Sequence, residues 1–326
     1  RAFRAAWPHG VHRCRYAGHV ANLKTLVSNL SKRGPHRVLV GDLSYVGLPG
    51  VVYTPAKGKG LPGIAFGHDW RSPVEDYHAT LRHLASWGIA VAAPNTENGF
   101  IPDHRGLAND LETAIQILAG VRLGAGEISV SPAKLGFAGH GMGAGAAVLA
   151  AAGRGNTKGV ACVYPADTAP SAEAAATNVD CPGLVLGPGE DQWLDRGNPR
   201  RLAVNWAGDV IFREVDNATQ AGFSETKLLR RLAGFSKSNV RHQEAARAML
   251  TGWLLATVDG DKDYKDFLDP DAKIKGTTYR SMDWLRDQLP ETEYQVLAGQ
   301  PHSLVGKPET LVTESNATPF SKLRDN

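Results

Sequence analysis

The stretch "GFAGHGMGAGAAVLAA", residues 136–151, predicts a buried strand, a sharp turn and a helix of small residues. The apolar run before the turn has the length of a strand, and the small residues after it let a helix lie close to a sheet. The turn itself reads Gly139-His140-Gly141-Met142-Gly143, and its glycines suit a tight change of direction. Gly141 stands at the centre, so the middle of this turn offers no nucleophilic side chain.

Short apolar runs alternate with helical patterns on both sides of this stretch. The runs that predict strands are "HRVLVG", "GVVYTP", "GIAFG", "GIAVAAP", "KLGFAG", "GVACVYP", "PGLVLG" and "DVIFREV". The helical patterns lie at about 74–87, 105–121, 143–153 and 239–257. This alternation predicts an α/β fold with a mostly parallel central sheet flanked by helices.

The chain divides into three segments. Residues 37–270 carry the alternating pattern, and residues 271–326 form a C-terminal extension in which "TTYRSMDWLRDQL" is expected to be helical. Residues 1–36 form a basic arm, because no acidic residue precedes Asp42, and 17–31 are expected to form an amphipathic helix. This arm is either a solvated extension or, through residues 1–37, a contact for an anionic surface.

Composition limits the function further. The chain has 326 residues, a formal net charge of +3, and three cysteines without metal-ligand spacing (Cys14, Cys162 and Cys181). The small net charge argues against specific nucleic-acid binding, and no apolar run reaches the roughly 18 residues of a membrane span. We expect no cofactor and no metal. The default location is the cytoplasm; peripheral membrane attachment is an alternative, and secretion stays open because the first residue is not Met.

Five motifs occur in a characteristic order along the chain. They are "HLASWGIAVAAPNTEN" (83–98), "GHGMG" (139–143), "GED" (189–191), "DNATQAGF" (216–223) and "GWLLATVDGDKDYKDFLDP" (252–270). Together they resemble the α/β-hydrolase superfamily, in particular the cutinase-like polyester (poly(ethylene terephthalate)) hydrolases of the dienelactone-hydrolase-like branch. Those enzymes show G-H-S-M-G at the elbow, E-N-D before the acid and D-G-A-S-H-F around the histidine. The resemblance implies an α/β-hydrolase fold with N- and C-terminal extensions.

The same resemblance assigns the catalytic positions. It places Gly141 at the nucleophile, Asp191 at the acid and Gln220 at the base. Glycine has no nucleophilic atom, and the amide of glutamine does not accept a proton at useful pH. The triad is therefore degenerate, with no intact catalytic set.

The resemblance also implies the surroundings of the site. The backbone N–H groups of His68 and Met142 take the two oxyanion-hole positions. Four further side chains follow the predicted strand ends and are candidates for the pocket lining: Asp69, Trp70, His140 and Trp193.

Three functions remain open. The first is a catalytically inactive α/β-hydrolase-like protein, a pseudoenzyme that binds an acyl or lipid-like ligand or a protein partner. The second is a slow, non-standard ester hydrolase that uses His68 or His140. The third is a scaffold or membrane-associated protein that acts through the basic N-terminal arm.

Overall fold

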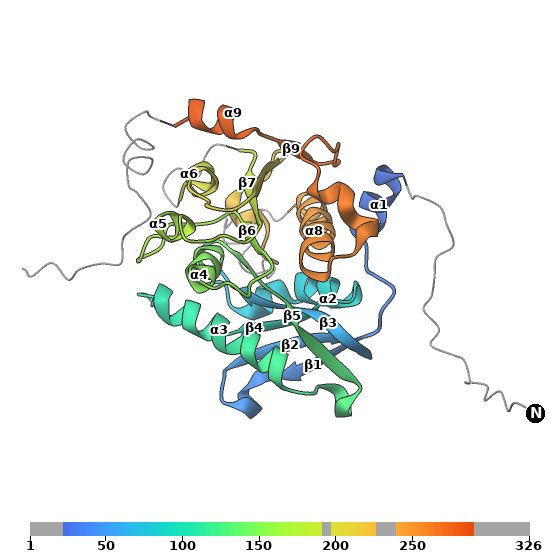
Figure 1. Ribbon diagram of the computed structural model, residues 1–326. Coiled ribbons are helices and arrows are strands. Elements are labelled where there is room, and N and C mark those ends of the chain that lie inside the picture. Colours follow the sequence, from blue (N-terminus) through green and yellow to red (C-terminus); the bar gives the residue numbers. More distant parts are fainter. Residues whose placement is uncertain (1–21, 191–196, 226–238, 290–326) are drawn as a thin grey trace, which may run out of the picture.

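The computed structural model describes residues 22–190, 197–225 and 239–289. Within these residues a single nine-stranded sheet runs through the molecule (Figure 1). The strands are β1 (Val38–Asp42), β2 (Gly50–Pro55), β3 (Gly58–Gly67), β4 (Ala90–Pro94), β5 (Ile128–His140), β6 (Val160–Val163), β7 (Gly183–Pro188), β8 (Val210–Val215) and β9 (Thr277–Tyr279). All eight predicted strands are present as β1 to β8.

The strand order across the sheet is β1-β2-β4-β3-β5-β6-β7-β8-β9. The central strands β4, β3, β5, β6, β7 and β8 pair in parallel, while β1, β2 and β9 join antiparallel at the two ends. This confirms an α/β fold with a mostly parallel central sheet and flanking helices, and it is compatible with an α/β-hydrolase fold. In a parallel sheet the carboxyl ends of the strands meet along one edge, where ligands usually bind.

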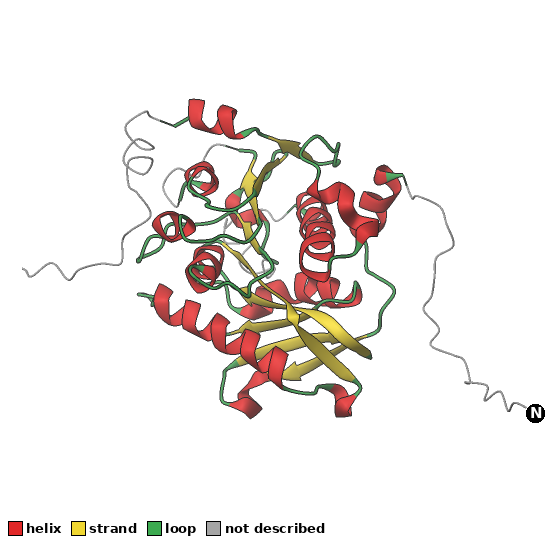
Figure 2. Ribbon diagram, viewed as in Figure 1, coloured by secondary structure: helices red, strands yellow, loops and turns green. Residues whose placement is uncertain are grey.

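Helices cover both faces of this sheet (Figure 2). They are α1 (Leu23–Leu30), α2 (His78–Ser86), α3 (His104–Gly120), α4 (Met142–Ala151), α5 (Ala172–Ala176), α6 (Pro199–Val204), α8 (Val240–Leu254) and α9 (Met282–Asp287). Residues of α3, α4, α5 and α6 pack into one apolar cluster, and residues of α1, α2 and α8 pack into a second on the opposite face. No helix of the described ranges is both long and apolar enough to cross a lipid bilayer.

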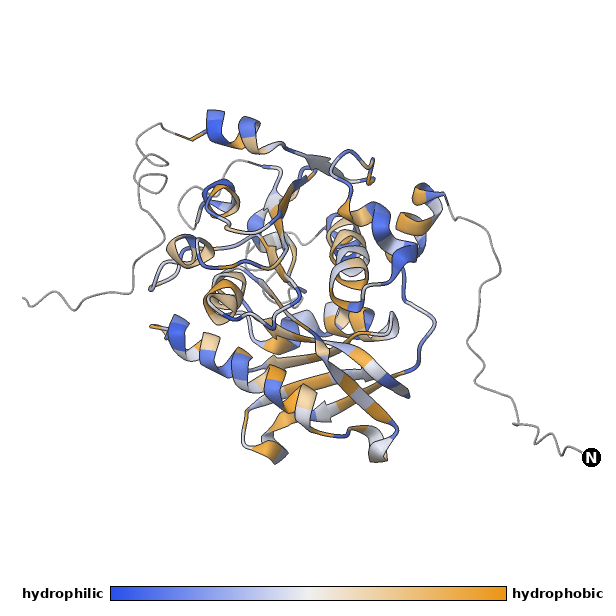
Figure 3. Ribbon diagram, viewed as in Figure 1, coloured by the Kyte–Doolittle hydropathy of each residue, from blue (hydrophilic) through white to orange (hydrophobic). Residues whose placement is uncertain are grey.

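The hydropathy pattern explains this layering. Strands β4, β6 and β7 are buried along their whole length, as expected where both faces are covered, whereas the helices carry hydrophilic as well as hydrophobic residues (Figure 3). Helix α4 differs, because nine of its ten residues are buried. Its alanines and glycines let it sit directly on the sheet beneath the elbow.

The segment predicted as a C-terminal extension begins inside the fold. Residues Thr277–Tyr279 pair with β8 as an antiparallel strand, so the prediction of a helix over all of 277–289 was wrong at its start. The helical part is limited to α9. Of the amphipathic helix predicted at 17–31, the described part is α1, which packs against α8.

Candidate functional site

The turn between β5 and α4 has the geometry of a strand-to-helix elbow. Gly141 adopts φ 56° and ψ −122°, a conformation that residues with side chains rarely adopt. Its N–H donates to the carbonyl oxygen of Val163 (3.0 Å), and its own carbonyl accepts from the N–H of Ala166 (3.0 Å). Close contact with β3 also demands glycine: a Cβ on Gly143 would lie 2.1 Å from the carbonyl carbon of Gly67.

The carboxylate of Asp69 lies against this elbow. Its Oδ1 atom accepts two backbone N–H groups, from Met142 and from Trp70, each at 2.8 Å. A Cβ built on Gly141 would lie 2.0 Å from Oδ1 and 2.7 Å from Oδ2 of Asp69. The carboxylate therefore fills the space in which a side chain at position 141 would begin.

The oxyanion-hole assignment from the sequence named the N–H groups of His68 and Met142. The Met142 N–H does point at an oxygen atom in the structure, namely Oδ1 of Asp69. The second N–H on that oxygen belongs to Trp70, two residues beyond His68. An oxyanion hole needs donors about 2.7–3.1 Å from the oxygen, and both of these N–H groups meet that criterion.

A buried chain of hydrogen bonds runs behind the elbow. The Asp69 N–H donates to the Tyr77 hydroxyl (3.1 Å), which lies 2.8 Å from His140 Nδ1, and His140 Nε2 lies 3.0 Å from the carbonyl oxygen of Gln220. A carbonyl only accepts, so Nε2 carries the proton and Nδ1 accepts from the tyrosine. The chain links the loop after β3 to the loop after β8.

Burial keeps the two side chains of this hydrogen-bond network, Tyr77 and His140, uncharged. Burial lowers the pKa of His140 below its ordinary value, although the nearby Asp69 carboxylate opposes the shift. Burial also raises the pKa of Tyr77 well above its ordinary value. Both rings are therefore neutral around pH 7, and neither nitrogen of His140 is available as a base for a substrate.

His68 is also turned away from reactive chemistry. Its side chain is fully buried, with Nδ1 2.9 Å from the carbonyl oxygen of Asp69 and Nε2 2.7 Å from that of Thr96. Both ring nitrogens thus face backbone carbonyl groups. The ring fixes the loop that carries Asp69 and Trp70, which is a structural task.

The remaining predicted site residues are placed unevenly. Gln220 begins a 3₁₀ turn after β8 (Gln220–Gly222) and contributes its backbone carbonyl to the chain described above. It also borders a small depression with Tyr164 and Pro165 that leaves no space for a water molecule. Asp191, the predicted acid, and Trp193 lie outside the described residues.

Trp70 is part of an exposed apolar surface beside the elbow. Its indole N–H donates to the carbonyl oxygen of Gly99 (3.2 Å), and its side chain is 39% exposed. Phe100 and Ile101 on the neighbouring loop are 81% and 93% exposed. The guanidinium of Arg71 lies over both aromatic rings, 5.7 Å from that of Trp70 and 5.0 Å from that of Phe100. We call Trp70, Arg71, Phe100 and Ile101 the aromatic rim.

A cavity of about 280 Å³ lies beside the loop after β6. It is lined by that loop and by the starts of α5 and α6, and its polar side chains are Asp167, Thr168, Ser171, Glu173, Asn198 and Arg201. Arg201 forms an ion pair with Glu173 at its wall. Such a lining suits a polar ligand better than an acyl chain.

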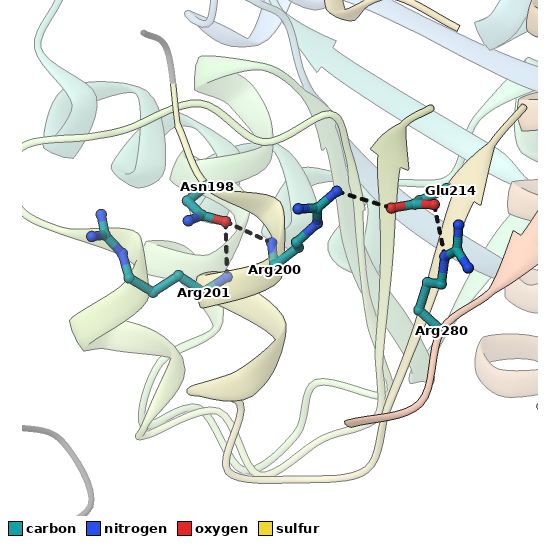
Figure 4. Close-up of polar contacts among 5 residues, drawn as sticks. All are labelled: Asn198, Arg200, Arg201, Glu214 and Arg280. Atoms are coloured by element: carbon teal, nitrogen blue, oxygen red, sulfur yellow. Dashed lines mark hydrogen bonds and ion pairs between the residues drawn. The ribbon is translucent and has the colours of Figure 1, made fainter. Parts of the chain in front are cut away.

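Two consecutive arginines at the start of α6, Arg200 and Arg201, contact different parts of the protein. Asn198 caps the helix by accepting the N–H groups of Arg200 and Arg201 (3.1 and 3.2 Å), and the two arginine side chains then point in opposite directions (Figure 4). Arg201 turns toward the cavity. Arg200 reaches Glu214 on β8 (3.3 Å), which also binds Arg280 (2.8 Å).

Sequence reasoning did not anticipate Tyr77 or the role of Asp69. A glycine at the centre of the elbow leaves a gap that some group must fill, and an acidic residue in the loop after β3 is the signal that could have identified that group. Among the described residues, no group of three or more His, Cys, Asp and Glu side chains is placed to hold a metal ion.

Comparison with known proteins adds no relative, since no family model matches the chain and a search of curated proteins finds no match. The likeness to hydrolases thus depends on the motifs along the chain. The strand order, compatible with an α/β-hydrolase fold, is the structural counterpart of those motifs.

Proposed function

We propose that this chain is a non-catalytic α/β-hydrolase-like protein, derived from a cutinase-like hydrolase architecture, that acts by binding. The observation that carries the proposal is the elbow itself. Gly141 supplies no nucleophile, and the space in front of it holds the Asp69 carboxylate. Acyl transfer needs an attacking oxygen and a base next to it, and the described part of the site offers neither.

The alternative of a slow hydrolase that uses His68 or His140 gains no support from the geometry. Both rings are buried, and both nitrogens of each ring contact protein atoms. A base must reach the proton that it abstracts, directly or through one water molecule. Either ring would first have to give up a buried hydrogen bond.

Of the two ligand classes, a protein partner fits the described surface better than an acyl or lipid-like molecule. The depression beside Gln220 has no room for a water molecule, and the larger cavity has polar walls. The aromatic rim, by contrast, presents exposed Trp, Phe and Arg side chains, the residue types that dominate protein interfaces. The basic arm up to residue 37 remains a separate candidate for contact with an anionic surface.

The test of the non-catalytic proposal is hydrolysis of a short-chain nitrophenyl ester by the full chain between pH 5 and 9. We expect no saturable turnover above the rate in protein-free buffer. His140→Asn and His68→Asn should leave that baseline unchanged. Saturable turnover that either substitution abolishes would overturn the proposal and establish the relocated-histidine enzyme.

A further inference from the structure

We propose that the backbone N–H groups of Met142 and Trp70 form a carboxylate-binding site whose resident ligand is Asp69. The chain thereby closes its own oxyanion hole. This inference deepens the proposed function and rests on it only in taking the elbow as the former catalytic site. Its test measures carboxylate binding, so it can fail while the non-catalytic proposal stands.

The first step of the argument is the match between donor geometry and carboxylate. Oδ1 of Asp69 lies 2.8 Å from both N–H groups, which converge on one oxygen. Hydrogen bonds from backbone N–H groups to an ionised carboxylate are stronger than those between neutral partners. Met142 is also the first residue of α4, a ten-residue helix, so the helix dipole favours a negative charge there.

The second step is that Asp69 and Gly141 depend on each other. Any residue other than glycine at position 141 would place a Cβ within 2.0 Å of Oδ1 and displace the carboxylate. Gly141 therefore does more than leave the elbow without a nucleophile. Only glycine at this position leaves room for the Asp69 carboxylate.

The third step is that the backbone of Asp69 is held at both ends. Its N–H donates to Tyr77 (3.1 Å), and its carbonyl oxygen lies near the ring of His68 (2.9 Å) and accepts the N–H of Ser72 (3.1 Å). These contacts fix the direction in which the side chain leaves the loop. A tethered and preorganised carboxylate outcompetes free carboxylates in solution, so the site of the unaltered chain is closed to them.

Removal of the side chain should open the site to small carboxylates. In Asp69→Ala the two N–H groups lose their acceptor, and a space of carboxylate size forms in front of Gly141. Formate is the probe, because it carries the carboxylate and nothing else. We expect the melting temperature of Asp69→Ala to fall below that of the unaltered chain and to rise saturably with sodium formate, while sodium chloride at equal ionic strength has no such effect.

Two variants calibrate this response. Asp69→Asn keeps an oxygen that can accept both N–H groups, so it should respond to formate no more than the unaltered chain does. Asp42→Ala is the matched control, because Asp42 also accepts a backbone N–H, that of Ser44 (2.8 Å), but at an exposed turn far from the elbow in sequence. Formate should not restore its stability beyond the effect of chloride.

Asp69→Ser provides a second open variant in case Asp69→Ala does not fold, since serine keeps a polar group in the loop. The same saturable response to formate is expected of it. A formate response equal to the chloride response in the folded open variants would overturn the carboxylate site. An equal formate response in Asp69→Asn would also overturn it, because the gain would then have another origin.

Discussion

Asp69 Oδ1 lies 2.0 Å from the point at which a Cβ of residue 141 would begin. Two heavy atoms that are not bonded to each other cannot lie so close, so the carboxylate in this position and a side chain at position 141 exclude one another. Together with φ 56°, this makes Gly141 costly to replace for two independent reasons.

The first prediction separates these two reasons. Gly141→Ala should lower the free energy of unfolding by about 1–3 kcal/mol through backbone strain, with a further loss because Asp69 must leave its two N–H donors. Gly153→Ala is the control, since Gly153 also has a positive φ of 71° but nothing within 4 Å of its missing Cβ. It should show the cost of a side chain at a positive φ without a collision, as measured by urea denaturation.

A double-mutant cycle completes this prediction. In an Asp69→Ala background the collision is gone, so Gly141→Ala should cost less than it does in the unaltered chain. Equal costs of Gly141→Ala in both backgrounds would contradict the contact between Asp69 and the elbow.

The second prediction concerns acid stability. His83 on α2 is 6% exposed, its Nε2 has no hydrogen-bond partner, and burial together with the nearby Arg247 charge lowers its pKa from 6.5 to about 4. Between these values the unfolded chain binds a proton that the folded chain does not. Stability should therefore fall as pH drops from 6.5 to about 4 and then level off, by about 3 kcal/mol from this group.

His83→Gln removes this titration, so its stability should depend less steeply on pH over that interval. His36→Gln, which replaces an exposed imidazole, serves as the control and should keep the steep dependence. The measurement is urea denaturation at half-unit steps between pH 4 and 7. Parallel pH profiles for His83→Gln and the unaltered chain would refute the assignment.

The third prediction concerns how α9 is held against the domain. Glu214 is 7% exposed and binds Arg200 and Arg280, and both guanidinium groups also lie over the Trp284 ring, at 5.1 and 4.4 Å. Glu214→Gln leaves the two positive charges side by side without their shared carboxylate. We expect a loss of about 1–3 kcal/mol in unfolding free energy and faster amide exchange in α9.

The control for this cluster is Asp283→Asn. Its ion pair with Arg286 is exposed, with 93% of the Asp283 side chain accessible, so the substitution should cost less than about 0.5 kcal/mol. If the two substitutions cost the same, the Glu214 cluster is an ordinary surface ion pair.

The sequence predicted the sheet well because its signals are local. Each of β1 to β8 contains an apolar run. Strand β9 is three residues long and exists through its pairing with β8, in which Thr277 lies opposite Val215, a residue distant in the sequence. The elbow was also predictable, since glycines at fixed spacing mark a tight turn. These features need no knowledge of distant contacts.

The position of the Asp69 carboxylate against Gly141 was not predictable in the same way. Asp69 was identified as a candidate pocket residue, but its contact with Gly141 exists because β3 and β5 are neighbours in the sheet and because the loop after β3 is fixed by Tyr77 and His68. The acidic residue in that loop is a local signal, but neither the strand neighbourhood nor the contacts with Tyr77 and His68 can be read from the residues around position 69. The same holds for Tyr77, whose partner His140 is 63 positions away.

The last prediction concerns ester hydrolysis by variants of the elbow. Gly141→Ser with Gln220→His restores the residue types that the hydrolase resemblance assigns to the nucleophile and base positions. The serine Cβ would collide with the Asp69 carboxylate, which also occupies the Met142 N–H that the resemblance assigns to the oxyanion hole. We therefore expect this double variant to hydrolyse nitrophenyl acetate no faster than the unaltered chain.

Adding Asp69→Gly frees both the space and the donor, so the triple variant should exceed the double variant. Loss of one oxyanion donor costs about 10²–10³ in kcat in hydrolases, which sets the expected size of the difference. The control combines Asp69→Gly with Gln220→His and keeps Gly141, so it lacks a nucleophile and should stay inactive. Equal activity of the Gly141→Ser, Gln220→His variant and the triple variant would show that Asp69 does not block the hole.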